Sequence, residues 1–206
     1  MKILTVSDYV EPGLYRDFDA EKFREIDLIL SCGDLPPEYL TFLSAKINAP
    51  LWFVRGNHDI RYIRHSPDGC RDLDGELIRF RGLRIMGLEG SRWYNGNPCQ
   101  YSEKGMRAKI RKLRFRLWWW KGVDIIITHA PPRFIHDEED LCHRGFRCFR
   151  KLINRYQPRY FIHGHIHRHF DSPEQRITRV GRTKIINTYG HYILNAENSK
   201  GGNKTV

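Results

Sequence analysis

Five short apolar runs recur along the chain, and each is followed directly by side chains that can bind a metal ion or take part in catalysis. The runs cover residues 3–6, 27–30, 51–54, 123–127 and 160–162. They are rich in β-branched and aliphatic residues, and stretches with helical spacing separate them, which is typical of βαβ units. The sequence therefore predicts an α/β fold with several parallel strands.

Antiparallel strands are expected in two further regions, where turn signals separate alternating segments. Asp74-Gly75 and Arg81-Gly82 mark turns between residues 74 and 87, and Gly181-Arg182 separates residues 176–180 from 183–186. A chain that combines parallel and antiparallel strands should form two sheets, or one large mixed sheet, covered by helices.

Two helices have clear sequence patterns. The first is an amphipathic stretch at residues 37–47 with prolines in its first turn. The second runs from Ser102, a plausible N-cap, to residue 121, with Gly122 as its stop. Its apolar stripe is Met106, Ile110, Leu113, Leu117 and Trp120. The other faces carry Arg107, Lys109, Arg111, Lys112, Arg114, Arg116, Trp118 and Trp119. We interpret them as the solvent-facing side of a packed helix rather than a nucleic-acid stripe.

The polar residues that follow the five runs form a set with metal-binding character. They are Asp8, Cys32-Gly33-Asp34, Gly56-Asn57-His58-Asp59, Thr128-His129 and Gly164-His165-Ile166-His167. In open α/β sheets the carboxyl ends of the strands are where ligands bind. Carboxylates, an amide and imidazoles buried there would lack partners unless something bound them. Because these donors include no thiolate, they suit Mn, Fe or Zn in a catalytic site better than a structural zinc site.

In this order the set resembles the calcineurin-like metallophosphoesterases, and the match spans residues 8 to 167. The resemblance implies a four-layer αββα sandwich in which two mixed β-sheets are flanked by helices. It also implies a divalent-metal-dependent phosphoesterase, in which a metal-bound hydroxide attacks the phosphorus of a phosphate-ester substrate.

The resemblance further implies a role for each matched residue at a centre with two divalent metal ions. Asp34 would bridge the ions. Asn57, His129 and His165 would complete one site, and Asp8 and His167 would contribute to the other. His58 would lie beside the phosphate as a catalytic residue, and Asp59 would orient the His58 imidazole.

The first motif departs from the family pattern. The family usually has Asp-x-His there, whereas this chain has Asp8-Tyr9-Val10. Valine has no lone pair, so we expect the Asp8 site to be weakened and the other site to be intact. Tyr9 and Glu11 are the nearest residues that could substitute as ligands.

Four further residues have less specific signals. Arg92 is a tentative substrate-binding residue that could pair with a phosphate, or else an ordinary surface arginine. Asp137 and His143 lie on a stretch that could cap the site, where a structural role is favoured. Cys32 is expected to pack as a small apolar group rather than to act as a nucleophile.

Composition limits the remaining possibilities. A chain of 206 residues with 40% apolar residues suits one domain, here residues 1–195, followed by a flexible tail at 196–206. No apolar run is long enough to span a membrane, so no membrane partner is expected. The five cysteines form no C-x-x-C pair, which favours a cytoplasmic location. The net charge of +11 attracts anions, which makes nucleic acid a possible but not favoured partner.

Three functional hypotheses remain open. The leading one is hydrolysis of a phosphodiester, with a phosphomonoester as the variant; the preference for diesters is an analogy with compact members of the family. The second is a nuclease, supported by the net charge alone. The third is a non-catalytic metal-binding or scaffold protein with a degraded first metal site, which Val10 favours and His58-Asp59 opposes.

Overall fold

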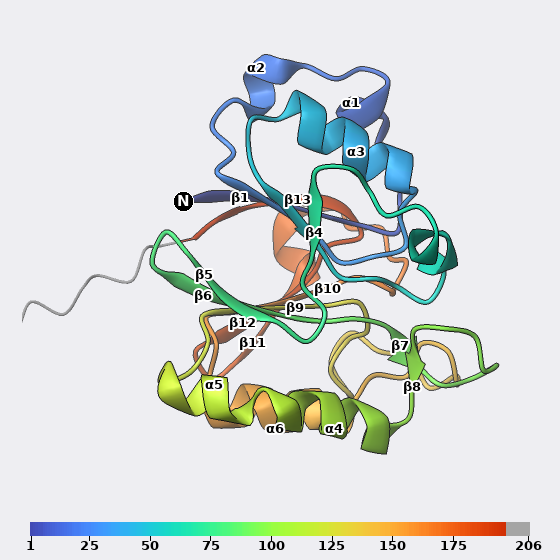
Figure 1. The fold of residues 1–206 in the computed structure, drawn as a ribbon, viewed down its shortest axis with the longest axis vertical. Coiled ribbons are helices and arrows are strands. Elements are labelled where there is room, and N and C mark those ends of the chain that lie inside the picture. The colour runs from blue at the N-terminus through green and yellow to red at the C-terminus, as the bar shows by residue number, and fades with distance from the viewer. Residues whose placement is uncertain (197–206) are drawn as a thin grey trace, which may run out of the picture.

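Two large mixed sheets stack face to face in the computed structural model, which describes residues 1–196 (Figure 1). The first sheet has the order β13-β1-β2-β3-β4. Its strands are β1 (Lys2–Ser7), β2 (Leu28–Ser31), β3 (Leu51–Phe53), β4 (Cys70–Asp72) and β13 (Gly190–Asn195). Strands β1 to β4 are parallel, and β13 pairs antiparallel with β1.

The second sheet has the order β11-β12-β10-β9-β6-β5. Its strands are β5 (Leu77–Phe80), β6 (Leu83–Leu88), β9 (Ile125–Thr128), β10 (Tyr160–His163), β11 (Ile177–Val180) and β12 (Thr183–Asn187). The central strands are parallel, while β5 and β11 are antiparallel additions at the two edges. A short parallel pair, β7 (Ser91–Arg92) and β8 (Gln100–Tyr101), lies outside both sheets.

Helices cover the outer face of each sheet. The first sheet is covered by α1 (Pro12–Tyr15), α2 (Ala20–Phe23) and α3 (Pro37–Lys46), and the second by α4 (Glu103–Lys112), α5 (Arg114–Trp119) and α6 (Arg147–Tyr156) (Figure 1). Short 3-10 turns occur at Asp59–Ile63 and Pro173–Arg176. The expected four-layer αββα sandwich with two mixed sheets is therefore confirmed.

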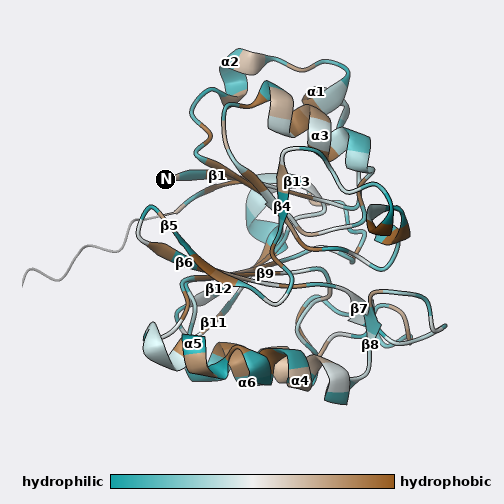
Figure 2. Cartoon of the chain, viewed as in Figure 1, coloured by the Kyte–Doolittle hydropathy of each residue, from teal (hydrophilic) through white to brown (hydrophobic). Residues whose placement is uncertain are grey.

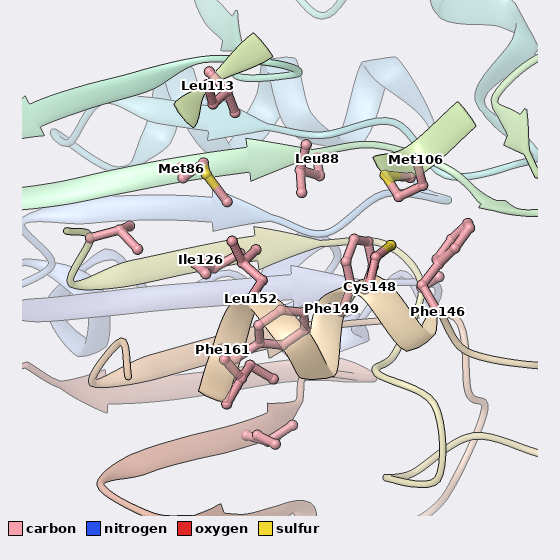
Figure 3. Close-up of a cluster of buried hydrophobic side chains, with 14 of the residues drawn as sticks. Met86, Leu88, Met106, Leu113, Ile126, Phe146, Cys148, Phe149, Leu152 and Phe161 are labelled. Carbon is pink, nitrogen blue, oxygen red and sulfur yellow. The ribbon is translucent and has the colours of Figure 1, made fainter. Parts of the chain in front are cut away.

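Three apolar clusters separate the four layers, and the hydrophobic residues of the strands follow this layering (Figure 2). One cluster fills the space between the sheets and includes Leu30, Ile127 and Ile162. A second joins the first sheet to its helices. The third packs α4, α5 and α6 on the second sheet, with Phe149 and Phe161 at its centre (Figure 3). Full burial of one such side chain contributes about 1.5–3 kcal/mol.

The helix predicted for residues 102–121 is wrong as one continuous helix. It divides at Leu113, whose N–H donates to Ile110 O three residues back instead of four. Both predicted ends are confirmed: Ser102 Oγ accepts from Gly105 N, and Gly122 follows the last turn with a φ of 112°. The apolar stripe is also confirmed, because its members belong to or pack against the third cluster.

One residue assigned to the solvent-facing side of that helix was misplaced. Lys109 is largely buried, and its Nζ donates to Asp74 Oδ2 at 2.7 Å and Glu89 Oε1 at 3.1 Å. The ion pairs explain the burial, since a lysine enters an interior only with its charge neutralised. Trp118 and Trp119 are exposed, as expected, and about two-thirds of each side chain contacts solvent.

The first and last described residues, Met1 and Ala196, lie beside each other next to the first sheet. Ala196 is buried, and its N–H donates to Met1 O at 2.8 Å. The rest of the tail predicted at 196–206 lies outside the described residues. Within residues 1–196, no helix combines the length and the apolar character needed to cross a bilayer.

Candidate metal centre

The predicted ligands converge at one edge of the sandwich, because the parallel strands of both sheets end there. Asp8, Asp34 and His165 follow β1, β2 and β10 and have positive φ angles of 63°, 57° and 68°. Such left-handed residues turn the chain sharply at the end of a strand. Two glycines make room for the ligands: a Cβ on Gly56 would lie 2.0 Å from Asp34 Oδ1, and one on Gly164 would lie 2.4 Å from Asp8 Oδ2.

Four of the predicted ligands form one buried group. His129 Nε2 lies 3.2 Å from Asp34 Oδ2 and 3.0 Å from Asn57 Oδ1. The His165 ring packs against the His129 ring with centroids 4.7 Å apart. Ligand atoms of Asp34, His129 and His165 all lie within 4.8 Å of one another. These residues are brought together as the sequence predicted for one metal site.

Hydrogen bonds from outside orient this group. His129 Nδ1 bonds Cys32 O at 2.7 Å, and His165 Nε2 bonds Cys142 O at 2.9 Å. Each imidazole therefore has one ring nitrogen hydrogen-bonded to a backbone carbonyl, and the other ring nitrogen is available to a metal ion. This is the usual arrangement of a metal-binding histidine. Asp34 Oδ1 accepts a hydrogen bond from His58 N at 2.8 Å, and the other carboxylate oxygen, Oδ2, faces His129.

The electrostatics of the group favour a cation. Burial opposes ionisation of Asp34, but the charge and hydrogen bond of His129 outweigh it and hold the pKa of the carboxyl below its usual range. In turn, although burial acts against it, Asp34 raises the pKa of His129. Burial and the neighbouring His129 charge lower the pKa of His165 to about 3. A divalent ion would supply the positive charge that the His129 proton otherwise provides.

The second predicted pair, Asp8 and His167, lies beside this group. His167 Nε2 is 3.4 Å from Asp8 Oδ1, and Asp8 Oδ2 accepts from His165 N at 2.9 Å. The Asp8 side chain is fully buried, and within residues 1–196 its Oδ1 has no hydrogen-bond partner. A buried, unpartnered carboxylate oxygen next to an imidazole fits a metal ligand. The residues present therefore fit the two-metal centre that the resemblance implied.

Comparison with known families decides the classification. Residues 1–169 match the sequence model described as calcineurin-like phosphoesterase. The chain belongs to this family. No curated protein matches the sequence at a significant level. The family chemistry is metal-dependent phosphoesterase chemistry, and the candidate metal centre of this calcineurin-like phosphoesterase lies where its motifs converge.

Solved structures share the fold at low sequence identity. TT1561 of Thermus thermophilus is similar with a TM-score of 0.62 and 18% identity, over 92% of this chain and 89% of that chain. GAP50, described as the anchor in the inner membrane complex of Plasmodium, is similar with a TM-score of 0.58 and 11% identity, over 91% of this chain and 70% of that chain. At these identities the similarity concerns the fold alone.

One predicted contact is wrong. Asp59 does not orient the His58 imidazole: its Oδ2 accepts from Asp34 N at 2.8 Å and from Gly56 N at 2.7 Å. Burial, reinforced by the Asp34 charge, raises the pKa of Asp59 to about 7. The carboxyl group therefore ties together the two loops that carry the predicted ligands Asp34 and Asn57. His58 is exposed, at the open side of the centre.

Neither residue proposed to replace the missing histidine at Val10 reaches the ligands in the described part of the chain. The Tyr9 ring packs on Tyr189, with centroids 6.1 Å apart. Glu11 Oε2 lies 3.5 Å from His191 Nδ1. Val10 itself packs against the apolar cluster beneath α1 to α3. Among residues 1–196, Asp8 and His167 thus remain the side chains predicted for the first site alone.

Arg92 is not brought to the metal centre. Its Nη1 donates to Glu103 Oε2 at 3.1 Å, and its guanidinium lies over the Phe146 ring. Cys32 is fully buried, and burial raises the pKa of its thiol well above the usual range, which suits a packing role. Asp137 is structural, because its Oδ2 accepts from Arg133 Nη1 at 2.7 Å and Gly145 N at 3.0 Å.

Two further residues lie beside the centre: Tyr94, to which the sequence assigned no role, and His143, which it placed on a stretch that could cap the site with a structural role favoured. Tyr94 Oη accepts from Asn57 Nδ2 at 3.1 Å, which orients the Asn57 amide so that its oxygen faces His129. The His143 ring lies next to the His165 ring, with centroids 5.1 Å apart. Neither residue belongs to a motif, and the structure adds their contacts with the predicted ligands Asn57 and His165.

Proposed function

We propose that this protein is a divalent-metal-dependent phosphoesterase that hydrolyses a phosphodiester, or else a phosphomonoester. The observation that carries the proposal is the convergence of two buried carboxylates, Asp8 and Asp34, with imidazoles at one edge of both sheets. The family match supports phosphoester chemistry. The preference for diesters remains an analogy with compact family members.

In the proposed mechanism each residue has a separate task. Asp34 would bridge two ions, with Asn57, His129 and His165 holding one and Asp8 and His167 holding the other. When bound, two divalent ions activate water and stabilise the charge that develops on the phosphoryl oxygens.

His58 would act on the substrate directly. It is exposed at the open side, and its backbone N–H is fixed by Asp34 Oδ1, so its imidazole can reach a phosphate placed over the centre. It would stabilise the phosphoryl charge or protonate the leaving oxygen.

The native metal and the compartment are part of the proposal. Oxygen and imidazole donors favour manganese, with iron or zinc as alternatives. All five cysteines are free, which supports a reducing compartment such as the cytoplasm. We also propose that residues 1–195 form a single catalytic domain.

The test combines metal analysis with hydrolysis of bis(p-nitrophenyl) phosphate, with and without added Mn²⁺. We expect metal-dependent turnover in the natural protein and its loss in Asp34→Ala. Arg92→Ala serves as the control outside the centre, and it should retain turnover. Absence of bound metal after loading with Mn²⁺, Fe²⁺ or Zn²⁺ would refute the proposed centre.

A second candidate function is a non-catalytic metal-binding or scaffold protein. The observation that favours it is Val10, which removes one ligand without a replacement among the described side chains near Asp8. Bound metal without turnover on a diester and a monoester would support this candidate.

A further inference from the structure

Residues 137–145, here called the cap loop, are fixed beside His165 of the candidate metal centre. At one end Asp137 Oδ2 accepts from Arg133 Nη1 and from Gly145 N. Gly145 packs so closely that a Cβ there would lie 2.6 Å from Pro131 O. In the middle of the loop, Cys142 O bonds His165 Nε2 at 2.9 Å. The loop is thus held both to its own base and to a predicted metal ligand.

His143 occupies a defined position in this loop. Its Nδ1 lies 3.0 Å from Asp140 Oδ2. Asp140 is fixed in turn, because its Oδ1 accepts from the N–H groups of Cys142 at 2.9 Å and His143 at 3.0 Å. The His143 ring lies beside the His165 ring, and ligand atoms of Cys142, His143 and His165 all lie within 4.8 Å of one another.

The hydrogen bonding of His143 matches that of the predicted ligand His129. In His129 the Nδ1 bonds a backbone oxygen, and the Nε2 faces Asp34 and Asn57. In His143 the Nδ1 pairs with a carboxylate, and within residues 1–196 no hydrogen bond is made by Nε2, the ring nitrogen that could bind a metal ion. A carboxylate on the outer ring nitrogen is the common device that fixes the tautomer and orientation of a metal-binding histidine.

We propose that His143 is a further metal ligand of this centre and that Asp140 is its positioning residue. His143 would bind, through Nε2, the ion that His165 also binds. The inference rests on the proposed metal binding at this edge, and it adds a donor that lies outside the matched motifs. The centre is then asymmetric: the ion at His165 gains an imidazole, whereas the ion at Asp8 has lost one at Val10.

The neighbouring thiol is the rival donor. Cys142 belongs to the same three-residue group, but its side chain hydrogen-bonds with the Tyr94 hydroxyl. No carboxylate orients it as Asp140 orients His143. The imidazole is therefore the better prepared ligand, and the two donors can be separated by experiment.

The test uses the full chain loaded with Co²⁺, whose unpaired electrons shift the proton resonances of bound imidazoles. Each coordinating histidine should give one strongly shifted, solvent-exchangeable ring N–H signal. We expect His143→Ala to lose one such signal and His65→Ala, which changes an exposed histidine outside the group, to lose none. Asp140→Asn should lower Co²⁺ affinity by about 10- to 100-fold, as loss of an outer-shell partner does.

Other results would overturn the inference. An unchanged set of shifted signals in His143→Ala, with circular dichroism showing a folded protein, would exclude His143 as a ligand. The thiol of Cys142 would be the ligand instead if two results came together. The natural protein would show a thiolate-to-cobalt charge-transfer band that disappears in Cys142→Ser, and His143→Ala would keep all its shifted signals. Failure of the proposed metal centre is distinguishable, because His129→Ala would then lose no signal either.

Discussion

Replacing Asp59 by asparagine or by alanine distinguishes a role in holding the loops from a role in orienting His58. Both accepted hydrogen bonds go to Oδ2, from Asp34 N and Gly56 N. Asparagine keeps one such oxygen, whereas alanine leaves two N–H groups without a partner. Each unsatisfied buried donor costs about 1–3 kcal/mol, so Asp59→Ala should lower the free energy of unfolding by about 2–6 kcal/mol.

The pH dependence gives the same prediction a second signature. Burial, followed by the Asp34 charge, raises the pKa of Asp59 to about 7, above its ordinary value in the unfolded chain. Between the ordinary pKa and about 7, the folded protein therefore binds a proton that the unfolded chain releases. Stability then falls by at most about 1.4 kcal/mol per pH unit as the pH rises through this window. An asparagine side chain does not titrate, so Asp59→Asn lacks this loss. Its free energy of unfolding, relative to that of the natural protein, should therefore be about 2 kcal/mol higher at pH 8 than at pH 5.5.

Urea unfolding of the chelator-treated protein at pH 5.5 and pH 8 measures both effects through the midpoint and the m-value. At pH 5.5 Asp59→Asn should resemble the natural protein, and Asp59→Ala should be much less stable. If Asp59→Asn is as unstable as Asp59→Ala at pH 5.5, an acceptor oxygen at this position does not hold the loops, and the loop-holding role is refuted. An equal difference between Asp59→Asn and the natural protein at both pH values would refute the raised pKa.

Two further substitutions test the geometry around the centre and the second sheet. In Gly164→Ala the new Cβ would lie 2.4 Å from Asp8 Oδ2, so bound Mn²⁺ should decrease and the free energy of unfolding should fall by about 1–3 kcal/mol; undiminished Mn²⁺ stoichiometry would contradict this. Asp124→Ala removes the two-pronged pairing with Arg84 (2.8 and 2.9 Å) and should cost about 3–5 kcal/mol in urea unfolding at pH 7. Although burial opposes it, Arg84 lowers the pKa of Asp124. The contribution of the Asp124–Arg84 pair to the free energy of unfolding should therefore be present at neutral pH and disappear only as the pH falls through that lowered pKa.

The strands and the ligand set were predictable because both are written in consecutive residues. Each central strand is an apolar run, and each ligand follows its strand within a few positions, so local patterns sufficed to place Asp8, Asp34 and His129 at one edge. The family resemblance then supplied the stacking of the two sheets. These parts of the prediction did not depend on how distant segments pack.

The parts that could not be predicted depend on contacts between distant segments. Strand β13 pairs with β1 from the other end of the chain, with Asn195 opposite Lys2, and nothing local shows that pairing. Tyr94 and His143 reach the centre only because their loops fold over it. The family resemblance implied that Asp59 orients His58, yet the Asp59 carboxylate accepts a hydrogen bond from the backbone of Asp34 on a neighbouring loop. Lys109 was misplaced because its partners Asp74 and Glu89 lie on other segments.

Val10→His tests whether the natural centre catalyses or only binds metal. The side chain packs at the margin of the apolar cluster beneath α1 to α3, so its loss should cost about 1 kcal/mol of stability. The added imidazole should raise the bound Mn²⁺ from about one ion per chain toward two, because Asp8 Oδ1 is buried without a hydrogen-bond partner and His167 is 3.4 Å away. Metal analysis and hydrolysis of bis(p-nitrophenyl) phosphate would be measured on both proteins. Turnover that appears only in Val10→His would identify the natural protein as a non-catalytic binder. Two ions and equal turnover in both proteins would show that the first site is complete without this histidine, contrary to the weakened site expected from the sequence.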